Sequence, residues 1–392
     1  LIIFSKVLKQ HVSGKAAWYP LLIFATGIFY LRYSTELKQY MPDALISLVI
    51  IWLAKDIDIV KTKPGRFALI WLLTGSVVVW GSMPSVFVLA GVGCYYGIIC
   101  LQQRNYKLLQ NICFIAITWA VQFSIYYYTI LSNQIHSSYL ANYHQQYFLR
   151  MPRYADDVAK NHDVIRAILQ NAMGGHPYFF MANKILMLMG IIALIIKRRA
   201  DALLLLLPVL LILFAALLKQ YSLIPRLTLF SMPLLLLLTG IGLQQLVRYK
   251  LAGIITSIVL LIFAVLNNPL QGIKHPLQQE QMTDALNYIT EQGIESSQLY
   301  VYTGAIESYR YYTQIHPGKN QWQGIQNARL IKEDISIEAL HTMASGQPEK
   351  SVLLYTIPFD SYFTKSVFEK YSPVKAEYKT TGCTVFLFEK KG

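Results

Sequence analysis

The feature that most constrains the fold of this 392-residue chain is a series of apolar runs separated by short loops, most of them basic. Hydrophobic residues make up 54% of the chain and charged residues only 14%, whereas an average soluble domain is about a quarter charged. A helix needs about 20 residues to cross a bilayer, and the shorter runs reach this length only with their flanks or when tilted. The sequence therefore predicts a mostly α, polytopic transmembrane bundle of about nine spans. These spans fall near residues 16–31, 44–54, 67–81, 86–101, 108–130, 178–196, 202–218, 227–246 and 251–265.

The basic loops all fall on one side of the membrane when the predicted spans are alternated. Lys and Arg are enriched in short cytoplasmic loops, so we predict that this side is cytoplasmic. The same loops explain the net charge of +14 through membrane topology, and we therefore expect no nucleic-acid partner. They are residues 6–15, 55–66, 102–107, 197–199 and 248–250.

The opposite side of the membrane receives the more polar segments, and we predict that it is extracytoplasmic. These segments are a polar island at 32–43, a turn at 82–85, a stretch at 131–177, a loop at 219–226 and the tail after Asn267.

The tail differs in composition from the rest of the chain. Buried strands are predicted at 298–302, 351–357 and 383–389, and helical spacing is found at 279–292 and 359–370. Strands that alternate with helices suggest a small α/β domain. We therefore predict a transmembrane domain at 1–267 and a soluble extracytoplasmic α/β domain at 268–392.

Aromatic and charged residues of this tail also allow a second interpretation. Glu307 and Arg310 lie among Tyr309, Tyr311 and Tyr312, a combination that suits sugar hydroxyls. The same pattern fits the packed and solvated faces of one helix, and both interpretations stay open.

The ends of the chain and its four cysteines say little about chemistry. Leu1–Val7 resembles the last turns of an apolar helix and shows no leader, so we expect that an N-terminal segment is missing. The cysteines predict neither a disulfide framework nor a zinc site. We predict no cofactor and leave a divalent-metal requirement open.

The polar island at 32–43 is the first candidate for a functional site. It places Glu36, Lys38, Tyr40 and Asp43 between two apolar runs. A charge at the centre of a bilayer is costly, so these side chains must lie where membrane meets water. They form either a hydrated turn or a site that meets a substrate anchored in lipid.

The island and a later segment resemble a known superfamily. Tyr33-Ser34, Glu36-Leu37-Lys38, Tyr40 and Asp43 are similar to the second outer loop of bacterial GT-C glycosyltransferases, which include the lipid A aminoarabinose transferases and the protein O-mannosyltransferases. Tyr221–Pro233 resembles a late segment of these enzymes, in which an outward-facing arginine or tyrosine precedes a Leu-Pro-rich span. The helix 281–289 and the aromatics 309–312 resemble their soluble tail.

The resemblance implies a multi-pass inverting glycosyltransferase of the bacterial cytoplasmic (inner) membrane. Such an enzyme takes a sugar from a polyprenyl-phosphate carrier and places it on a lipid, glycan or protein acceptor outside the cytoplasm. The main catalytic acid of the superfamily lies in the first outer loop, which we expect to precede Leu1.

The chemistry of such a transfer assigns roles to the polar residues of the outer loops. The leaving phosphate gains negative charge, and fixed cations stabilise it, so Lys38, Lys219 and Arg226 are predicted to bind substrate together with Tyr40. An acceptor hydroxyl needs a carboxylate to receive its proton, and Glu36 and Asp43 are the carboxylates of the short outer loops.

Each of these residues also has a structural interpretation. Asp43 suits the start of a helix, where it meets the dipole and free N–H groups. Glu36 and Lys38 suit a hydrated loop, and Arg226 suits contact with lipid headgroups.

A transporter or flippase of lipid-linked glycans is the alternative function. Transporters place polar groups at mid-depth and often have repeated halves with broken helices. The predicted spans contain few such groups, Gln122 and Asn183 being the clearest, and the sequence shows no repeat. A membrane-anchored sensor is a third interpretation, for which the tail shows no recognisable ligand site.

Overall fold

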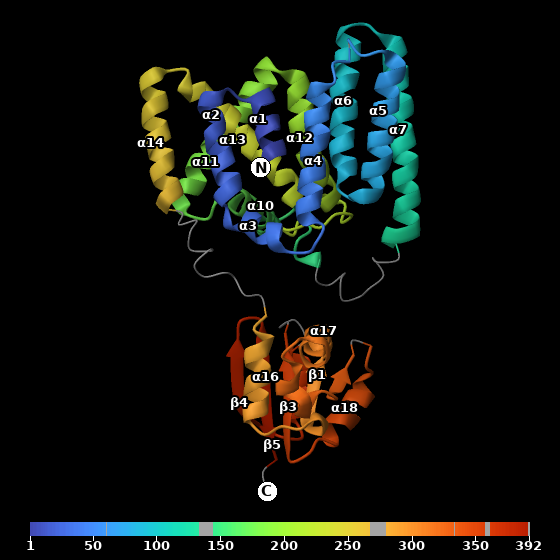
Figure 1. Ribbon diagram of the computed structural model, residues 1–392, viewed down its shortest axis with the longest axis vertical. Coiled ribbons are helices and arrows are strands. Elements are labelled where there is room, and N and C mark those ends of the chain that lie inside the picture. The colour runs from blue at the N-terminus through green and yellow to red at the C-terminus, as the bar shows by residue number, and fades with distance from the viewer. Residues whose placement is uncertain (60, 133–143, 267–279, 333, 357–360, 391–392) are drawn as a thin grey trace. The chain divides into compact units, whose positions relative to one another are not determined.

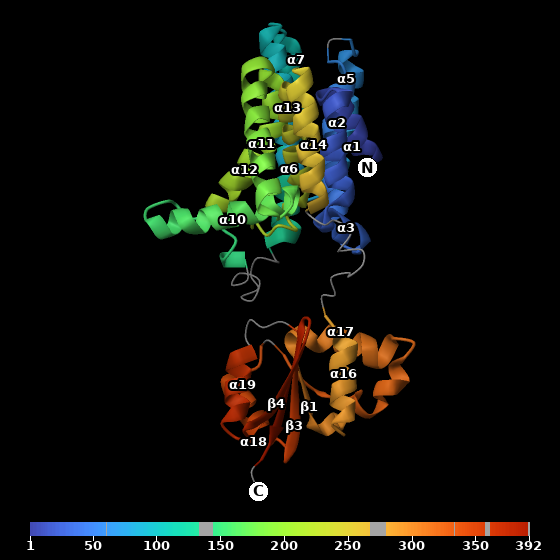
Figure 2. The ribbon, with the colours of Figure 1, turned by 90° about the vertical axis from the view of Figure 1, so that its left-hand side faces the viewer.

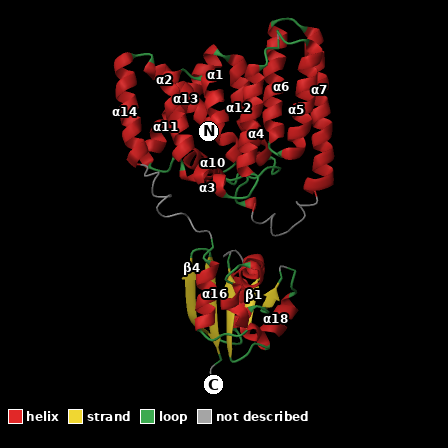
Figure 3. Ribbon diagram, in the orientation of Figure 1, coloured by secondary structure: helices red, strands yellow, loops and turns green. Residues whose placement is uncertain are grey.

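The computed structural model describes the chain except for residues 60, 133–143, 267–279, 333, 357–360 and 391–392. The chain divides into two compact units, Leu1–His275 and Pro276–Gly392 (Figure 1). The described strands all belong to the second unit (Figure 3). The boundary predicted at 267–268 lies outside the described residues, as does part of the predicted outer stretch 131–177.

The first unit is a bundle of helices. Short stretches of other helix types extend two of them: a π-helical turn, Tyr127–Leu131, follows α7, and a 3₁₀ turn, Leu229–Ser231, precedes α13. In chain order the α-helices are α1 (Ile2–His11), α2 (Gly14–Thr26), α3 (Ile28–Thr35), α4 (Tyr40–Asp56), α5 (Pro64–Gly81), α6 (Ser85–Gln102), α7 (Tyr106–Tyr126), α10 (Ala155–Met173), α11 (Pro177–Lys197), α12 (Arg199–Leu217), α13 (Met232–Val247) and α14 (Lys250–Leu266).

Six helices among the described residues are long and apolar enough to cross a membrane. They are Pro64–Gly81, Ser85–Gln102, Tyr106–Leu131, Pro177–Lys197, Arg199–Leu217 and Leu229–Val247.

The remaining predicted spans are divided or short. α3 and α4 pass the same test only as a pair bent by 108°, which makes a seventh span if the pair is counted as one. The predicted span 16–31 is split, because α2 ends at Thr26 and α3 begins at Ile28. The apolar part of α14, Gly253–Val265, is also short. The count of nine spans therefore stays a prediction.

Helix α13 is the most buried of the six long helices. Every side chain from Met232 to Leu243 is buried, and Gly242 faces Gly190 of α11. A Cβ atom on Gly242 would lie 1.8 Å from the carbonyl oxygen of Leu186, so only glycine allows the two backbones to approach this closely. Helices α2, α10 and α14 also pack against α13, whereas α5, α6 and α7 pack with one another.

The connections of the bundle collect at its two ends. The turns after α1, α4, α6, α11 and α13 lie at one end, shown uppermost in Figure 1, and they contain the basic loops of the sequence. The other end carries the α3–α4 break, the α5–α6 turn and the loop 218–228. Helix α10 also lies there and runs across the direction of the long helices (Figure 2).

The second unit is a five-stranded mixed sheet in the order β2-β1-β3-β5-β4. Strands β2, β1 and β3 are parallel, whereas β5 pairs antiparallel with both β3 and β4. The strands are β1 (Leu299–Tyr302), β2 (Arg329–Ile331), β3 (Lys350–Tyr355), β4 (Val374–Thr380) and β5 (Cys383–Glu389).

Helices cover both faces of this sheet. Leu299, Val301 and Leu354 face α16 (Met282–Glu291) and α17 (Ile306–Arg310). Tyr300 and Leu353 alternate to the opposite face and pack with α18 (Ile337–Ser345) and α19 (Ser361–Glu369) (Figure 2). The predicted strand 298–302 is confirmed by β1 and the strand 383–389 by β5. β2, β4 and α18 were not predicted.

Cysteine labelling tests which end of the bundle faces the cytoplasm. In a cysteine-free background, we expect Asp163→Cys and Lys319→Cys to react with a membrane-impermeant maleimide in intact cells. Arg199→Cys should react only after permeabilisation, because it lies at the end that carries the basic loops. All three positions are exposed. The reverse labelling pattern would overturn the side assignment and the outer placement of the site.

Candidate functional site

The helical conformation is interrupted between α3 and α4. α3 ends at Thr35, α4 begins at Tyr40, and residues 36–39 connect them. Irregular backbone in a membrane domain is tolerated where it is covered by protein or lines a cavity, because its polar groups would otherwise meet hydrocarbon.

An open cavity of about 930 Å³ adjoins this break and is bounded by α1, α2, α3 and α4. Its wall is polar at the break, where Ser34, Glu36, Lys38 and Gln39 line it, and apolar elsewhere. A wall that changes from apolar to charged suits a ligand with a hydrocarbon part and a polar head. The apolar lining includes Ile3, Phe4, Phe24, Leu31, Met41, Ala44, Leu45 and Leu48.

Two of the predicted site residues, Glu36 and Lys38, line this cavity together. Glu36 pairs with Arg32 across 3.2 Å between Oε1 and Nε, and both side chains are partly exposed. Exposed ion pairs contribute little stability, so an arriving charged group can compete for either partner. Lys38 is exposed and lies beside the N-terminal, positive end of the α4 dipole. This mouth therefore attracts anions.

Asp43 lies on a different side of α4. Its neighbours Pro42 and Ala44 line the cavity, whereas Asp43 is buried, with 7% exposure, and faces Ser82 of the α5–α6 turn and Tyr221. Because α4 begins at Tyr40 rather than at Ala44, Asp43 lies in the first turn of the helix and not at its cap. The dipole still favours its carboxylate there.

Tyr40 and Arg226 meet at the start of α4. The guanidinium carbon of Arg226 lies 6.0 Å from the centre of the Tyr40 ring, at the outer limit of a cation–π contact. Tyr40 in turn packs edge-on against Tyr33, at 5.3 Å between ring centres. Since Tyr33 lines the cavity, a pair of tyrosines connects the cavity wall to Arg226.

His144 also approaches Arg226, from the segment that precedes α10. Burial lowers the pKa of His144, and the charge of Arg226 lowers it further, so its imidazole is neutral at pH 7. The backbone N–H of Leu223 donates to the carbonyl of Tyr147 at 3.2 Å, which joins this segment to the Arg226 loop. The sequence assigns His144 only to the outer stretch 131–177.

Lys219 is not brought together with the other predicted residues. It lies two residues after the end of α12, with φ of 58°, and is exposed. Within the described ranges its ammonium group forms no ion pair. The structure therefore divides the candidates into a cavity pair, Glu36 and Lys38, a loop group, Tyr40, Asp43 and Arg226, and Lys219 apart.

Metal ions in proteins are held by sets of ligands such as His, Cys, Asp and Glu side chains. In the part of the chain that the structure describes, no three His, Cys, Asp or Glu side chains are grouped to hold a metal ion. The cationic side chains near the α3–α4 break include those of Lys38, Arg32 and Arg226.

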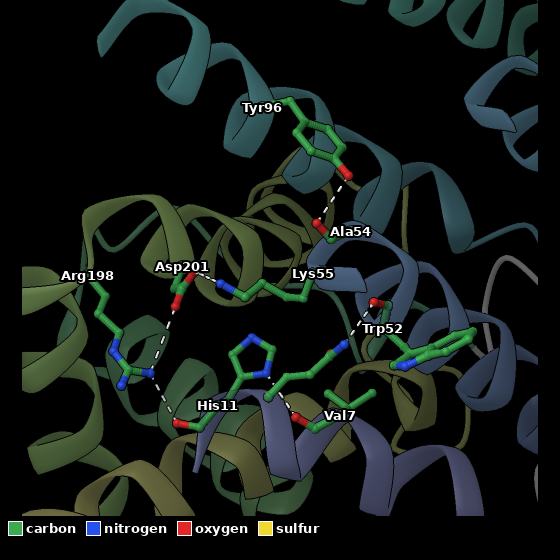
Figure 4. A network of polar contacts seen from close by, with 9 residues as sticks. Val7, His11, Trp52, Ala54, Lys55, Tyr96, Arg198 and Asp201 are labelled. Atoms are coloured by element: carbon green, nitrogen blue, oxygen red, sulfur yellow. Dashed lines mark hydrogen bonds and ion pairs between the residues drawn. The ribbon is translucent and has the colours of Figure 1, made fainter. Parts of the chain in front are cut away.

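A second polar cluster lies at the opposite end of the bundle and was not predicted from the sequence (Figure 4). Lys55 of α4 pairs with Asp201 of α12 at 2.9 Å, and Arg198 approaches the other oxygen of Asp201 at 4.0 Å. Arg198 also donates to the carbonyl of His11 at 3.1 Å. The cluster thus ties α1 and α4 to α12.

His11 occupies the interior of this cluster. Its ring is 2% exposed, and Nδ1 bonds the carbonyl of Val7 at 3.0 Å, one turn earlier in α1. A neighbouring bond, from Gln10 to the carbonyl of Trp52 at 3.3 Å, adds a second connection between α1 and α4. We interpret this end as the fixed end of α4, since two independent contacts hold it.

Comparison of the chain with protein-family models, with curated proteins and with solved structures finds no match.

Replacing Asp201 tests the interpretation of the second cluster. Asp201→Asn leaves Lys55 and Arg198 without their carboxylate in a largely buried place, and we expect a loss of roughly 3 kcal/mol of stability. Thermal unfolding of the detergent-solubilised protein measures it. Asp163→Asn is the matched control, because Asp163 has a side chain 74% exposed and should change the melting temperature little. Equal melting temperatures for both variants would contradict a role of the cluster in fixing α4.

Proposed function

We propose that this chain is part of an integral membrane glycosyltransferase of the GT-C type. It would move a sugar from a polyprenyl-phosphate carrier to a lipid, glycan or protein acceptor on the extracytoplasmic side of a bacterial inner membrane. The observation that carries the proposal is the cavity whose wall passes from apolar side chains to Glu36 and Lys38 at the helix break.

The apolar part of the cavity suits the hydrocarbon chain of the carrier. Its walls come from α1, α2 and α4, and contact with them would remove part of the polyprenyl chain from water. The head of the same lipid then reaches the break, where Lys38 supplies a point charge and the start of α4 supplies its dipole. The hydrocarbon chain and the anionic head of the carrier would thus each contact a matching surface of the same site.

Transfer breaks the bond between the anomeric carbon and the phosphate oxygen, whose electron pair stays on the phosphate. The acceptor oxygen forms the new bond to that carbon and gives up its proton. Lys38 and Arg226 stabilise the charge that develops on the phosphate, which is usually the largest catalytic contribution in such a step. Glu36 or Asp43 would orient the acceptor or receive its proton.

The polar groups inside the spans favour an enzyme over a transporter. Asn183 accepts a hydrogen bond from Tyr19 at 2.7 Å and donates to the carbonyl of Met173 at 3.0 Å. Gln122 donates to Ser76 at 2.8 Å. Both side chains therefore bond to neighbouring helices, whereas a transport path needs polar groups that face a cavity at mid-depth. The broken pair α3–α4 is the feature that a flippase would share.

Substitution of Arg226 tests the phosphate contact. In full-length protein reconstituted into proteoliposomes, Arg226→Ala should lower transfer from an undecaprenyl-phosphate sugar about a hundredfold, because one charge-assisted contact to the leaving group is lost. Arg226→Lys should recover only part of the rate, since the charge remains and the planar fork is lost. The exposed Arg153 provides the control: Arg153→Ala should transfer normally. A normal rate in Arg226→Ala would contradict the assignment.

Asp43→Asn separates a catalytic carboxylate from a structural one. Asparagine keeps the shape of the side chain and its hydrogen-bonding capacity, while the negative charge and the basicity are removed. We expect a protein that melts near the wild-type temperature but has lost most transfer activity, whereas undecaprenyl phosphate still binds, as measured by native mass spectrometry. If transfer persists in the folded variant, Asp43 has only a structural part at the start of α4.

A further inference from the structure

The second unit carries a cluster of aromatic side chains at the margin of one apolar core, in which Trp322 is buried and against which Tyr312 packs. α17 continues into a π-helical turn, Tyr311–Ile315, and π-helical turns occur often at functional sites. The wide turn brings Tyr312 to 5.2 Å from Tyr311 and to 5.2 Å from His316, measured between ring centres. Trp322 closes the cluster at 6.0 Å from Tyr312.

Hydrogen bonds of buried side chains hold the cluster in place. The Trp322 ring is 3% exposed, and its indole N–H donates to Asn287 of α16 at 3.0 Å. Thr313 is fully buried and donates to the carbonyl of Tyr309 at 2.8 Å. Because these contacts fix the turn before any ligand arrives, binding there would require little ordering of side chains.

Several side chains of the cluster are exposed to solvent. Tyr311 is 45% exposed and Ile315 is 70% exposed, while Tyr312 and His316 are partly exposed. Nδ1 of His316 accepts the backbone N–H of Gly318 at 3.0 Å, so the neutral ring carries its proton on Nε2 and can donate a hydrogen bond there. Exposed amides of Gln314 and Gln321 border the rings.

The two cationic side chains near the rings, Arg310 and Lys319, already contact neighbouring groups. Arg310 faces Glu307 at 3.4 Å, and Lys319 donates to the carbonyl of Gln314 at 3.0 Å. Beside these contacts the surface offers aromatic faces, amides and an imidazole donor, which match the C–H faces and hydroxyls of a neutral sugar.

We propose that the surface formed by Tyr311, Tyr312, His316 and the amides beside them binds a neutral glycan. This site lies in the second unit and is separate from the transfer site. Its function does not depend on Lys38 or Arg226, so it can stand if the proposed transferase activity fails.

Isothermal titration calorimetry on the full chain in nanodiscs tests the proposal, with maltotetraose, chitotetraose and mannotetraose as probes. At least one of them should bind saturably, and Tyr311→Ala should weaken that binding about tenfold. Tyr311→Phe, which keeps the ring, should retain most of it. Arg226→Ala should bind the same probe as the wild type does, which separates this site from the transfer site.

The chain offers a matched control for the aromatic contact. Tyr371 is 42% exposed and lies 6.0 Å from His341, close to the 5.9 Å between Tyr311 and His316. Tyr371→Ala should leave glycan binding unchanged. The proposal is overturned if none of the probes binds saturably, or if Tyr371→Ala weakens binding as much as Tyr311→Ala does in proteins with equal circular dichroism.

Discussion

The break between α3 and α4 is the constraint on which the candidate site depends. A helix satisfies its own backbone groups, and a chain that leaves the helix within a membrane domain must find other partners or water for them. Here the break opens onto a cavity, and its four residues place Glu36 and Lys38 at the boundary between apolar wall and water. The same break starts a new helix dipole that points its positive end toward the mouth.

Helix α4 links the two ends of the bundle. At its C-terminal end Lys55 is fixed by Asp201, and at its N-terminal end Tyr40 and Asp43 face the Arg226 loop while Pro42 and Ala44 face the cavity. Because α4 is held at its C-terminal end, the side chains on its two faces keep defined positions. In the proposed reaction the cavity face would receive the hydrocarbon chain of the carrier, and the start of α4 would lie beside its phosphate.

The second unit is packed differently from the first. Its sheet is covered by helices on both faces, yet the π-helical turn after α17 projects aromatic rings that neither apolar core requires in full. A rigid surface of this kind suits weak, repeated contacts with sugars. If both proposals hold, one chain combines a site for a lipid-linked sugar with a site that holds a glycan, and the two can be separated by mutation.

Local patterns in the sequence determined the helices and the buried strands, because an apolar run or a two-residue alternation acts on neighbouring residues. Strand 383–389 is such a case, whereas β2 has only three residues and β4 alternates charges along a sheet edge, so neither gives an apolar signal. The polar island at 32–43 could be recognised for the same reason, because its polar residues are neighbours in the sequence. Only the tertiary structure decided that Asp43 faces away from Glu36, that Tyr40 meets Arg226 and that His11 packs beside Asp201. These relations join residues up to 190 positions apart, and they depend on which helices pack together, which no local pattern encodes.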